Sequence, residues 1–175
     1  MSASPKSALI VIDLQNDYFP GGLLPLWNTD GTLRNIVAAI GKARAGGIPV
    51  IHVQHVANAA KGIAPFFNAG TPGAEIHPEV LAAAPDAPVV VKEYADSFHD
   101  TTLEQVLSGL GVEELLVCGM MTQNCVTHTA LSKGAEKYKV TVLTDCSTTV
   151  SEMLHLIALN ALSTRVALQP VAAVL

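Results

Sequence analysis

The sequence has few charged residues, few aromatic residues and no long hydrophobic run, and each shortage excludes a class of protein. Only 14% of the 175 residues are charged, and the ten Lys and Arg residues are scattered. Without a basic stripe, we expect neither nucleic-acid binding nor a polybasic contact with a membrane surface. Charges, glycine or proline interrupt every apolar stretch before the roughly 18 residues that a membrane-spanning helix needs. We therefore expect no membrane partner.

Cysteine is scarce as well. The three cysteines, Cys118, Cys125 and Cys146, are an odd number without CxxC spacing, which excludes a disulfide framework and a zinc ribbon. The segment Met1 to Lys6 is polar and lacks the charged-then-apolar pattern of a signal peptide. A reduced, cytoplasmic protein is the resulting expectation.

What the sequence has is short blocks of Ala, Val and Leu, and half of its residues are hydrophobic. Such blocks are typical of strands that are buried on both faces. They alternate with stretches in which apolar residues recur at helical spacing. The pattern predicts strands at 8–12, 48–55, 88–92, 114–118, 140–144 and 165–168, and helices at 31–46, 101–110, 123–138 and 151–162. Because strands that alternate with helices form parallel sheets, we expect a three-layer α-β-α sandwich around a six-stranded parallel sheet, with residues 1–175 as one domain. The segment 57–88 is predicted to be a long irregular loop that covers part of the domain.

Three polar residues follow apolar strands and are candidates for chemistry. Asp13 and Lys92 come where predicted strands end, and Cys125 lies six residues after Gly119. The ends of parallel strands share one edge of a sheet, so these side chains are expected to converge there. A neighbouring ammonium lowers the pKa of a thiol, and a carboxylate can take up its proton. Individually, Asp13 is also consistent with a turn cap, Lys92 with a solvent-exposed strand end and Cys125 with a small buried hydrophobic residue.

The stretch around Cys125 narrows these alternatives. Gly119 permits a tight exit from its strand, and Thr122 is a suitable cap for a following helix. Cys125 would then lie in the first helical turn, where free backbone N–H groups can hold an oxyanion.

The chain resembles the isochorismatase-like cysteine hydrolases, which include nicotinamidases, N-carbamoylsarcosine amidases and isochorismatases. The resemblance extends from about Ala8 to Leu168 and rests on three blocks in the order of the family. They are the run IVIDLQNDYF over residues 10–19, the lysine after the valine run 89–91, and Gly119-Met120-Met121-Thr122 followed by Cys125. The resemblance implies a Rossmann-like six-stranded sheet and a catalytic triad of Asp13, Lys92 and Cys125.

The family also implies a mechanism. The Met120–Met121 peptide bond would be cis, and the backbone amides of Met121 and Cys125 would form the oxyanion hole. The Cys125 thiolate would attack a carbonyl carbon, an amine would leave, and water would hydrolyse the thioester. Asp13 would carry the proton, and Lys92 would hold the thiolate and Asp13 in place.

The histidines depart from the metal-binding pattern of nicotinamidases. The region after the second strand has no Asp-x-His pair, and His77 lies far along the loop. His52 and His55 are three residues apart and face opposite sides of a regular strand, so they cannot chelate one ion together. We therefore expect no metal and no cofactor, and nicotinamidase activity is disfavoured.

The expected function is hydrolysis of a C–N bond in a small amide or carbamoyl substrate. One alternative is cleavage of a vinyl ether with Asp13 as the acid and Cys125 as a bystander. Another is a binding or assembly module with weak catalysis.

Further residues are expected to line the pocket, and the chain is expected to associate with itself. The low charge and the Ala-rich helices 31–45 and 151–162 favour a homo-oligomer, a dimer or a tetramer as in the family. The candidate pocket residues are Gln15, Phe19, Trp27, His55, Phe66, Met120 and His128.

Overall fold

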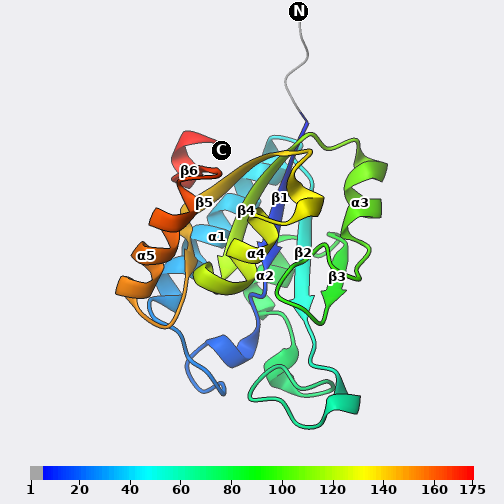
Figure 1. Ribbon diagram of the computed structural model, residues 1–175, viewed down its shortest axis with the longest axis vertical. Coiled ribbons are helices and arrows are strands. Elements are labelled where there is room, and N and C mark those ends of the chain that lie inside the picture. Colours follow the sequence, from blue (N-terminus) through cyan, green and yellow to red (C-terminus); the bar gives the residue numbers. More distant parts are fainter. Residues whose placement is uncertain (1–5) are drawn as a thin grey trace, which may run out of the picture.

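The computed structural model describes residues 6–175, which form a parallel sheet with helices on both faces (Figure 1). Residues 1–5, which make up most of the segment examined for a signal peptide, lie outside the described part of the chain. The six strands lie in the order β3-β2-β1-β4-β5-β6, and every neighbouring pair is parallel. Their bounds are β1 Ser7–Ile12, β2 Val50–His55, β3 Val89–Lys92, β4 Glu114–Met120, β5 Lys139–Thr148 and β6 Ala167–Gln169. The predicted six-stranded α/β sandwich is confirmed.

The helices divide between the two faces of the sheet. α1 (Thr29–Ala45) and α2 (Pro78–Ala83) pack on one face. α3 (Leu103–Leu110), α4 (Thr127–Ala130) and α5 (Glu152–Leu162) pack on the other. None of the helices in residues 6–175 has the length and apolar character needed to cross a lipid bilayer.

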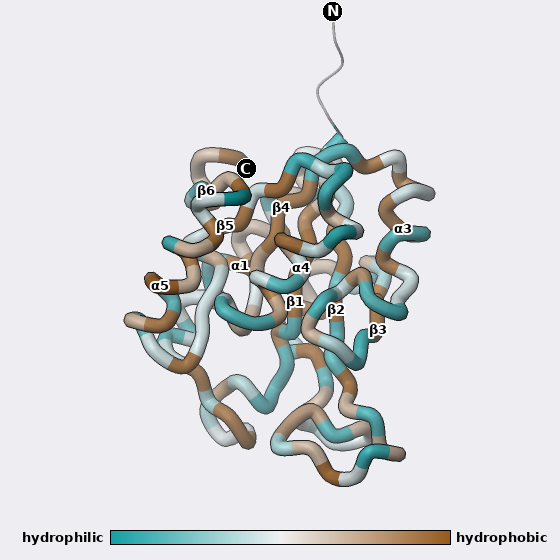
Figure 2. The backbone as a smooth tube through the Cα atoms, viewed as in Figure 1, coloured by the Kyte–Doolittle hydropathy of each residue, from teal (hydrophilic) through white to brown (hydrophobic). Residues whose placement is uncertain are grey.

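The central strands supply the core on both faces, and Figure 2 shows hydrophobic residues concentrated along them. In β1, Leu9 and Val11 join the apolar cluster under α1, whereas Ala8, Ile10 and Ile12 join the cluster on the opposite face. This division follows from the two-residue period of a strand. The direction of the crossovers changes between β1 and β4, the position at which open parallel sheets bind ligands.

One predicted helix is wrong. Instead of a helix over Gln123–Tyr138, the chain forms a π-helical turn at Thr122–Val126, the short helix α4 and a 3₁₀ turn at Lys133–Ala135. The side chain of Ser132 accepts a hydrogen bond of 3.1 Å from Gly134 N. Because such a local bond offers the backbone an alternative to the helical ladder, the helix ends before it.

Several other boundaries differ from the prediction, and β5, for example, extends to Thr148 instead of ending at residue 144. The segment 57–88 is not irregular throughout, since α2 begins at Pro78, where the fixed φ of proline suits a first helical position. β4 continues past Cys118 to Met120, so Gly119 lies within the strand and does not end it.

Gly119 is required by the approach of β4 to β1. Its φ is +126°, and a Cβ atom there would lie 2.1 Å from the carbonyl oxygen of Ile12. We expect Gly119→Ala to destabilise the protein by about 4 kcal/mol or more, because neither backbone can move without breaking the sheet. Urea unfolding would measure this change.

Gly41→Ala is the matched control, because a Cβ at this position of α1 would meet nothing within 4 Å. It should stabilise the fold by about 0.5–1 kcal/mol, since alanine favours the helix. Similar unfolding free energies for the two variants would contradict the proposed close approach at Gly119.

Candidate active site

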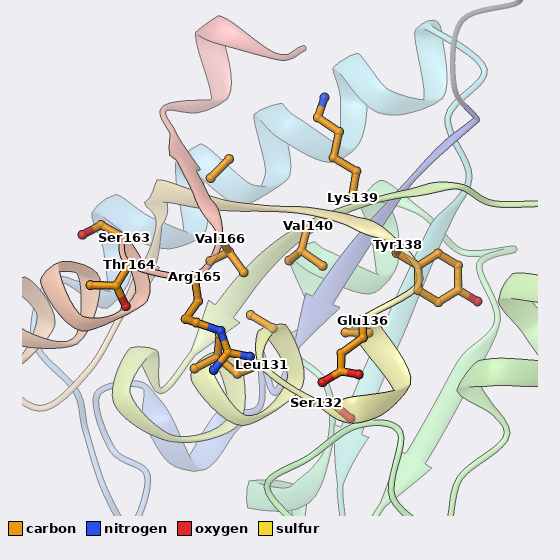
Figure 3. Close-up of a pocket in the computed structure, with 13 residues that line it drawn as sticks. Leu131, Ser132, Glu136, Tyr138, Lys139, Val140, Ser163, Thr164, Arg165 and Val166 are labelled. Carbon is orange, nitrogen blue, oxygen red and sulfur yellow. The ribbon is translucent and has the colours of Figure 1, made fainter.

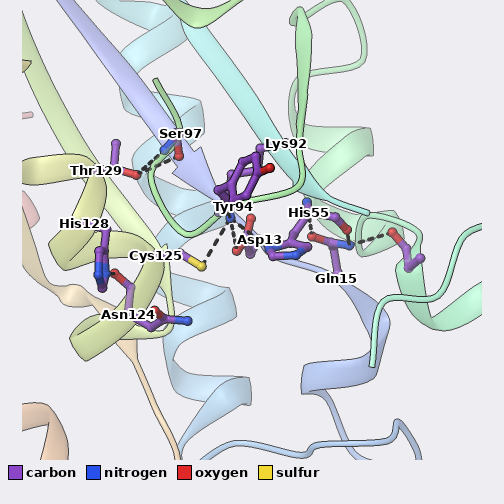
Figure 4. A network of polar contacts seen from close by, with 11 residues as sticks. Asp13, Gln15, His55, Lys92, Tyr94, Ser97, Asn124, Cys125, His128 and Thr129 are labelled. Atoms are coloured by element: carbon purple, nitrogen blue, oxygen red, sulfur yellow. Dashed lines mark hydrogen bonds and ion pairs between the residues drawn. The ribbon is translucent and has the colours of Figure 1, made fainter. Parts of the chain in front are cut away.

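Asp13, Lys92 and Cys125 lie together at the carboxyl ends of the strands (Figure 4). Asp13 follows β1 directly, Lys92 is the last residue of β3, and Cys125 lies in the turn after β4. Lys92 Nζ donates a hydrogen bond of 2.9 Å to Asp13 Oδ2 and one of 3.2 Å to Cys125 Sγ. The structure thus brings together three side chains that are far apart in the sequence.

The three side chains are almost completely buried. The exposed fractions are 0% for Asp13, 2% for Lys92 and 1% for Cys125. Asp13 leaves its strand with a φ of +54°, a conformation that is uncommon for residues other than glycine. Its backbone N–H donates to Val53 O of β2, which holds the turn in place. A buried carboxylate and a buried ammonium require each other as partners, because either charge alone would be strongly destabilising.

The resting charges of the site follow from this burial. Burial opposes the charge on Lys92, but Asp13 and Cys125 together raise the pKa of the ammonium, so it stays charged. Burial and the Asp13 carboxylate raise the pKa of the Cys125 thiol, and Lys92 only partly offsets them. Asp13 and Lys92 already balance each other, so an ionised thiol would add an uncompensated charge. The pKa of the Cys125 thiol therefore lies above its ordinary value in this conformation.

Asp13 has one carboxylate oxygen that could take up the proton of the Cys125 thiol. Oδ2 accepts from Lys92, whereas Oδ1 is buried and has no hydrogen-bond partner among residues 6–175. A carboxylate oxygen of Asp13 also lies within 4.8 Å of Cys125 Sγ. Transfer of the thiol proton to this carboxylate would leave the total charge of the site unchanged. The arrangement can therefore ionise the sulfur without burying a new net charge.

His55, at the end of β2, is the fourth polar side chain at this edge. One ligand atom each of Asp13, His55 and Cys125 lie within 4.8 Å of one another, as in a metal site. However, Lys92 Nζ contacts all three, at 2.9 Å, 3.1 Å and 3.2 Å respectively. Because an ammonium occupies the centre, these residues do not fit a metal cation.

His52 and His77, the other histidines that the sequence analysis considered as metal ligands, contact other parts of the chain. His52 Nε2 lies 3.2 Å from Ala84 O after α2, on the face of the sheet opposite His55. The side chain of His77 accepts from Glu79 N, at 3.4 Å, at the start of α2.

The turn that carries Cys125 differs in detail from the predicted helix start. The Met120–Met121 peptide bond is cis. Thr122 does not cap a helix as expected, because its hydroxyl lies 2.8 Å from His155 Nδ1 of α5. This contact attaches the turn to α5.

The two adjacent aromatic residues after β1, Tyr18 and Phe19, lie in different surroundings. Burial, followed by the negative charges of Asp13, Cys125 and Asp17, raises the pKa of Tyr18, which is almost fully buried. Phe19 instead packs on His77, with ring centroids 4.4 Å apart. Phe19 also lines a cavity of about 570 Å³ together with Asp17 and His77. Its place in the substrate pocket stays a prediction.

Two other expected pocket residues have structural contacts. The Gln15 side-chain amide exchanges hydrogen bonds of 2.7–2.8 Å with the backbone of His55 and also donates to Ala74 O, so it is fully occupied. Met120 is fully buried within the apolar core under α1. In this conformation both side chains are enclosed by the protein, and their place in the substrate pocket stays a prediction.

The last three expected pocket residues are spread around the site. The Phe66 ring lies 5.5 Å from that of Tyr18, and the Trp27 ring lies 6.1 Å from that of His155. His128 is exposed, and its Nδ1 lies 2.8 Å from Asn124 O. None of the three belongs to the triad's hydrogen-bond network in the described residues.

Cavities lie near both the starts and the ends of the strands. One, of about 610 Å³, lies between α4 and the starts of β5 and β6, remote from the carboxyl strand ends (Figure 3). A smaller one, of about 270 Å³, is lined by His55 and Tyr94, both of which contact Lys92. This cavity therefore reaches immediate neighbours of the triad.

Known proteins are similar to this chain in sequence and in architecture. A family model described as "Isochorismatase domain" matches residues 7–173. An uncharacterized isochorismatase family protein, YddQ, of Bacillus subtilis is 40% identical over 84% of this chain and 81% of its own length. Nicotinamidase 3 of Arabidopsis thaliana is 30% identical over 87% and 78%. A crystal structure of an isochorismatase family protein from Desulfovibrio vulgaris superposes with a TM-score of 0.87, covering 97% of this chain and 96% of that one at 30% identity. The chain is therefore a hydrolase of the isochorismatase family.

Proposed function

We propose that this protein hydrolyses a C–N bond of a small amide or carbamoyl compound through a thioester on Cys125. The observation that carries the proposal is the contact of Cys125 Sγ with Lys92 Nζ at 3.2 Å, with Asp13 in the same cluster and its Oδ1 without a hydrogen-bond partner among residues 6–175. The likeness to a nicotinamidase supports amide chemistry.

The first half of the reaction forms the thioester. As Sγ attacks the substrate carbonyl carbon, its proton passes to Asp13, and the carbonyl electrons move onto oxygen. The backbone N–H groups of Met121 and Cys125 would stabilise this oxyanion. Collapse of the tetrahedral intermediate breaks the C–N bond, and protonated Asp13 gives its proton to the leaving nitrogen. Ammonia or an amine departs.

The second half regenerates the enzyme. Asp13, again a carboxylate, takes a proton from water as the water oxygen attacks the thioester carbon. The C–S bond then breaks, a carboxylic acid leaves, and the sulfur recovers a proton. Lys92 stays charged throughout and compensates the negative charge as it moves between Asp13 and Cys125.

Substrate binding requires movement around the sulfur, because Cys125 is only 1% exposed in this conformation. We propose that the pocket opens beside His55 and Tyr18, with Phe66, Trp27 and His128 farther from the sulfur.

We also propose a cytoplasmic homo-oligomer, a dimer or a tetramer. The three cysteines are free, as in a reducing compartment. On α5, the large apolar side chains of Met153, Leu156 and Ile157 are exposed, which supports contact with a second copy.

The proposed function is tested by a screen of the purified protein against small primary amides, ureas and carbamoyl compounds, with ammonia release as the readout. We expect at least one class to release ammonia in proportion to enzyme concentration. Turnover of a vinyl ether without any amide turnover would contradict the proposal.

A further inference from the structure

His55 has two ring nitrogens in different surroundings. Nδ1 lies 3.1 Å from Lys92 Nζ. An ammonium has only hydrogens to offer, so the nitrogen that faces it must be the unprotonated acceptor. The proton of the neutral ring is therefore on Nε2. Burial, followed by the charge of Lys92, lowers the pKa of His55, which keeps the ring neutral.

Nε2 of His55 is an unused donor. It makes no hydrogen bond with any residue of 6–175 and is not among the enclosed atoms that lack a partner, so it is open to a ligand. His55 lines the cavity of about 270 Å³ beside Tyr94. The backbone that carries the ring is held in place, because the Gln15 side chain bonds both the backbone N–H and the backbone C=O of His55.

The charges of this cavity balance. Lys61 and Glu93 both line it and form an ion pair with each other. Lys61 Nζ also lies 5.3 Å from the centre of the Tyr94 ring. The cavity therefore presents no unpaired charge among the described residues to attract a charged ligand.

We propose that His55 determines substrate specificity by donating a hydrogen bond from Nε2–H to an uncharged acceptor, such as a second carbonyl oxygen close to the carbon attacked by Cys125. The inference rests on the proposed function, since it takes the sulfur as the reacting atom. It adds the substrate class, namely small amides that carry a further neutral acceptor next to the scissile bond.

Two variants distinguish the role of Nδ1 of His55 from the role of Nε2. In His55→Asn, the short side chain can still accept from Lys92 in place of Nδ1 but does not reach the position of Nε2. In His55→Gln, the longer side chain places an N–H group near the position of Nε2 and gives up the contact with Lys92. Thermal unfolding would first verify that both variants fold.

The probes are iodoacetamide, which carries a neutral acceptor, and iodoethane, which carries none. Rates of Cys125 alkylation by each reagent are measured by mass spectrometry at one mildly alkaline pH. The rate with iodoacetamide is divided by the rate with iodoethane, and this ratio is compared with the same ratio measured for free cysteine. Because both reagents need the same thiolate, the ratio cancels changes in sulfur reactivity. We expect a ratio about fivefold above that of free cysteine in the wild type and in His55→Gln, and its loss in His55→Asn, as for one neutral hydrogen bond.

An unchanged ratio in His55→Asn, or an equal loss in both variants, would overturn the inference and leave the proposed function standing. A larger enrichment with iodoacetate than with iodoacetamide would overturn the assignment to uncharged acceptors. Failure of all three reagents to label native wild-type Cys125 would overturn the proposed function together with the inference.

Discussion

Cys125→Ser is expected to lower amide hydrolysis by about 10⁴-fold or more, since loss of a nucleophile removes the covalent route. A serine hydroxyl in this site would have to lose a proton that is held far more tightly than that of a thiol. The measurement is the initial rate of ammonia release with the best amide from the screen. Mass spectrometry of the quenched wild-type reaction should show an acyl adduct on Cys125, and the variant should show none.

Cys146→Ala is the control for this substitution. Cys146 is also buried and free, but it lies in β5 and has no hydrogen bond with Asp13, Lys92 or Cys125 among residues 6–175. Its loss should reduce stability and leave turnover within a fewfold of the wild type. Turnover by Cys125→Ser within tenfold of the wild type would identify the thiol as a bystander, as the vinyl-ether alternative requires.

Asp13→Asn should have opposite effects on turnover and on thiol reactivity. Turnover is expected to fall by about 10²–10⁴-fold, because an amide cannot take up the thiol proton. The Asp13 carboxylate is one of the groups that raise the pKa of Cys125, while Lys92 lowers it. Removing the carboxylate therefore lowers this pKa, and the rise of iodoacetamide labelling with pH should begin at a lower pH than in the wild type.

Asp17→Asn provides the comparison for this effect. Asp17 is buried as well, but its oxygens accept backbone hydrogen bonds from Leu23 and Phe67 and not from the triad. This variant should lose stability without changing the pH dependence of labelling. If Asp13→Asn shifted labelling to higher pH, or kept most of the turnover, the proton would not pass between Cys125 and Asp13.

The strand ends were the most predictable part of the site. Asp13 and Lys92 each close a short apolar run, and parallel strands bring such ends to one edge, so local patterns were enough to pair them. The surroundings of Cys125 were predicted less well. The helix expected around it is a π-helical turn followed by a short helix, partly because the Thr127 hydroxyl donates to Thr122 O and competes with the regular ladder.

The sequence also could not predict the different side-chain directions of two neighbouring residues on a turn. Tyr18 packs against Phe67 whereas Phe19 packs against His77, and the short 3₁₀ turn at Asn16–Tyr18 directs the two rings to these different neighbours. Composition cannot distinguish two adjacent aromatic residues whose side chains point in different directions.

By itself, the sequence determined the parallel sheet, the polar residues at its carboxyl edge and the family, because strand periodicity and short motifs are local properties of the chain. Only the tertiary structure decided the direction in which the pKa of Cys125 is shifted and the orientation of His55. Both depend on burial and on distances of about 3 Å between residues from different strands, and such distances arise from packing that no local pattern encodes.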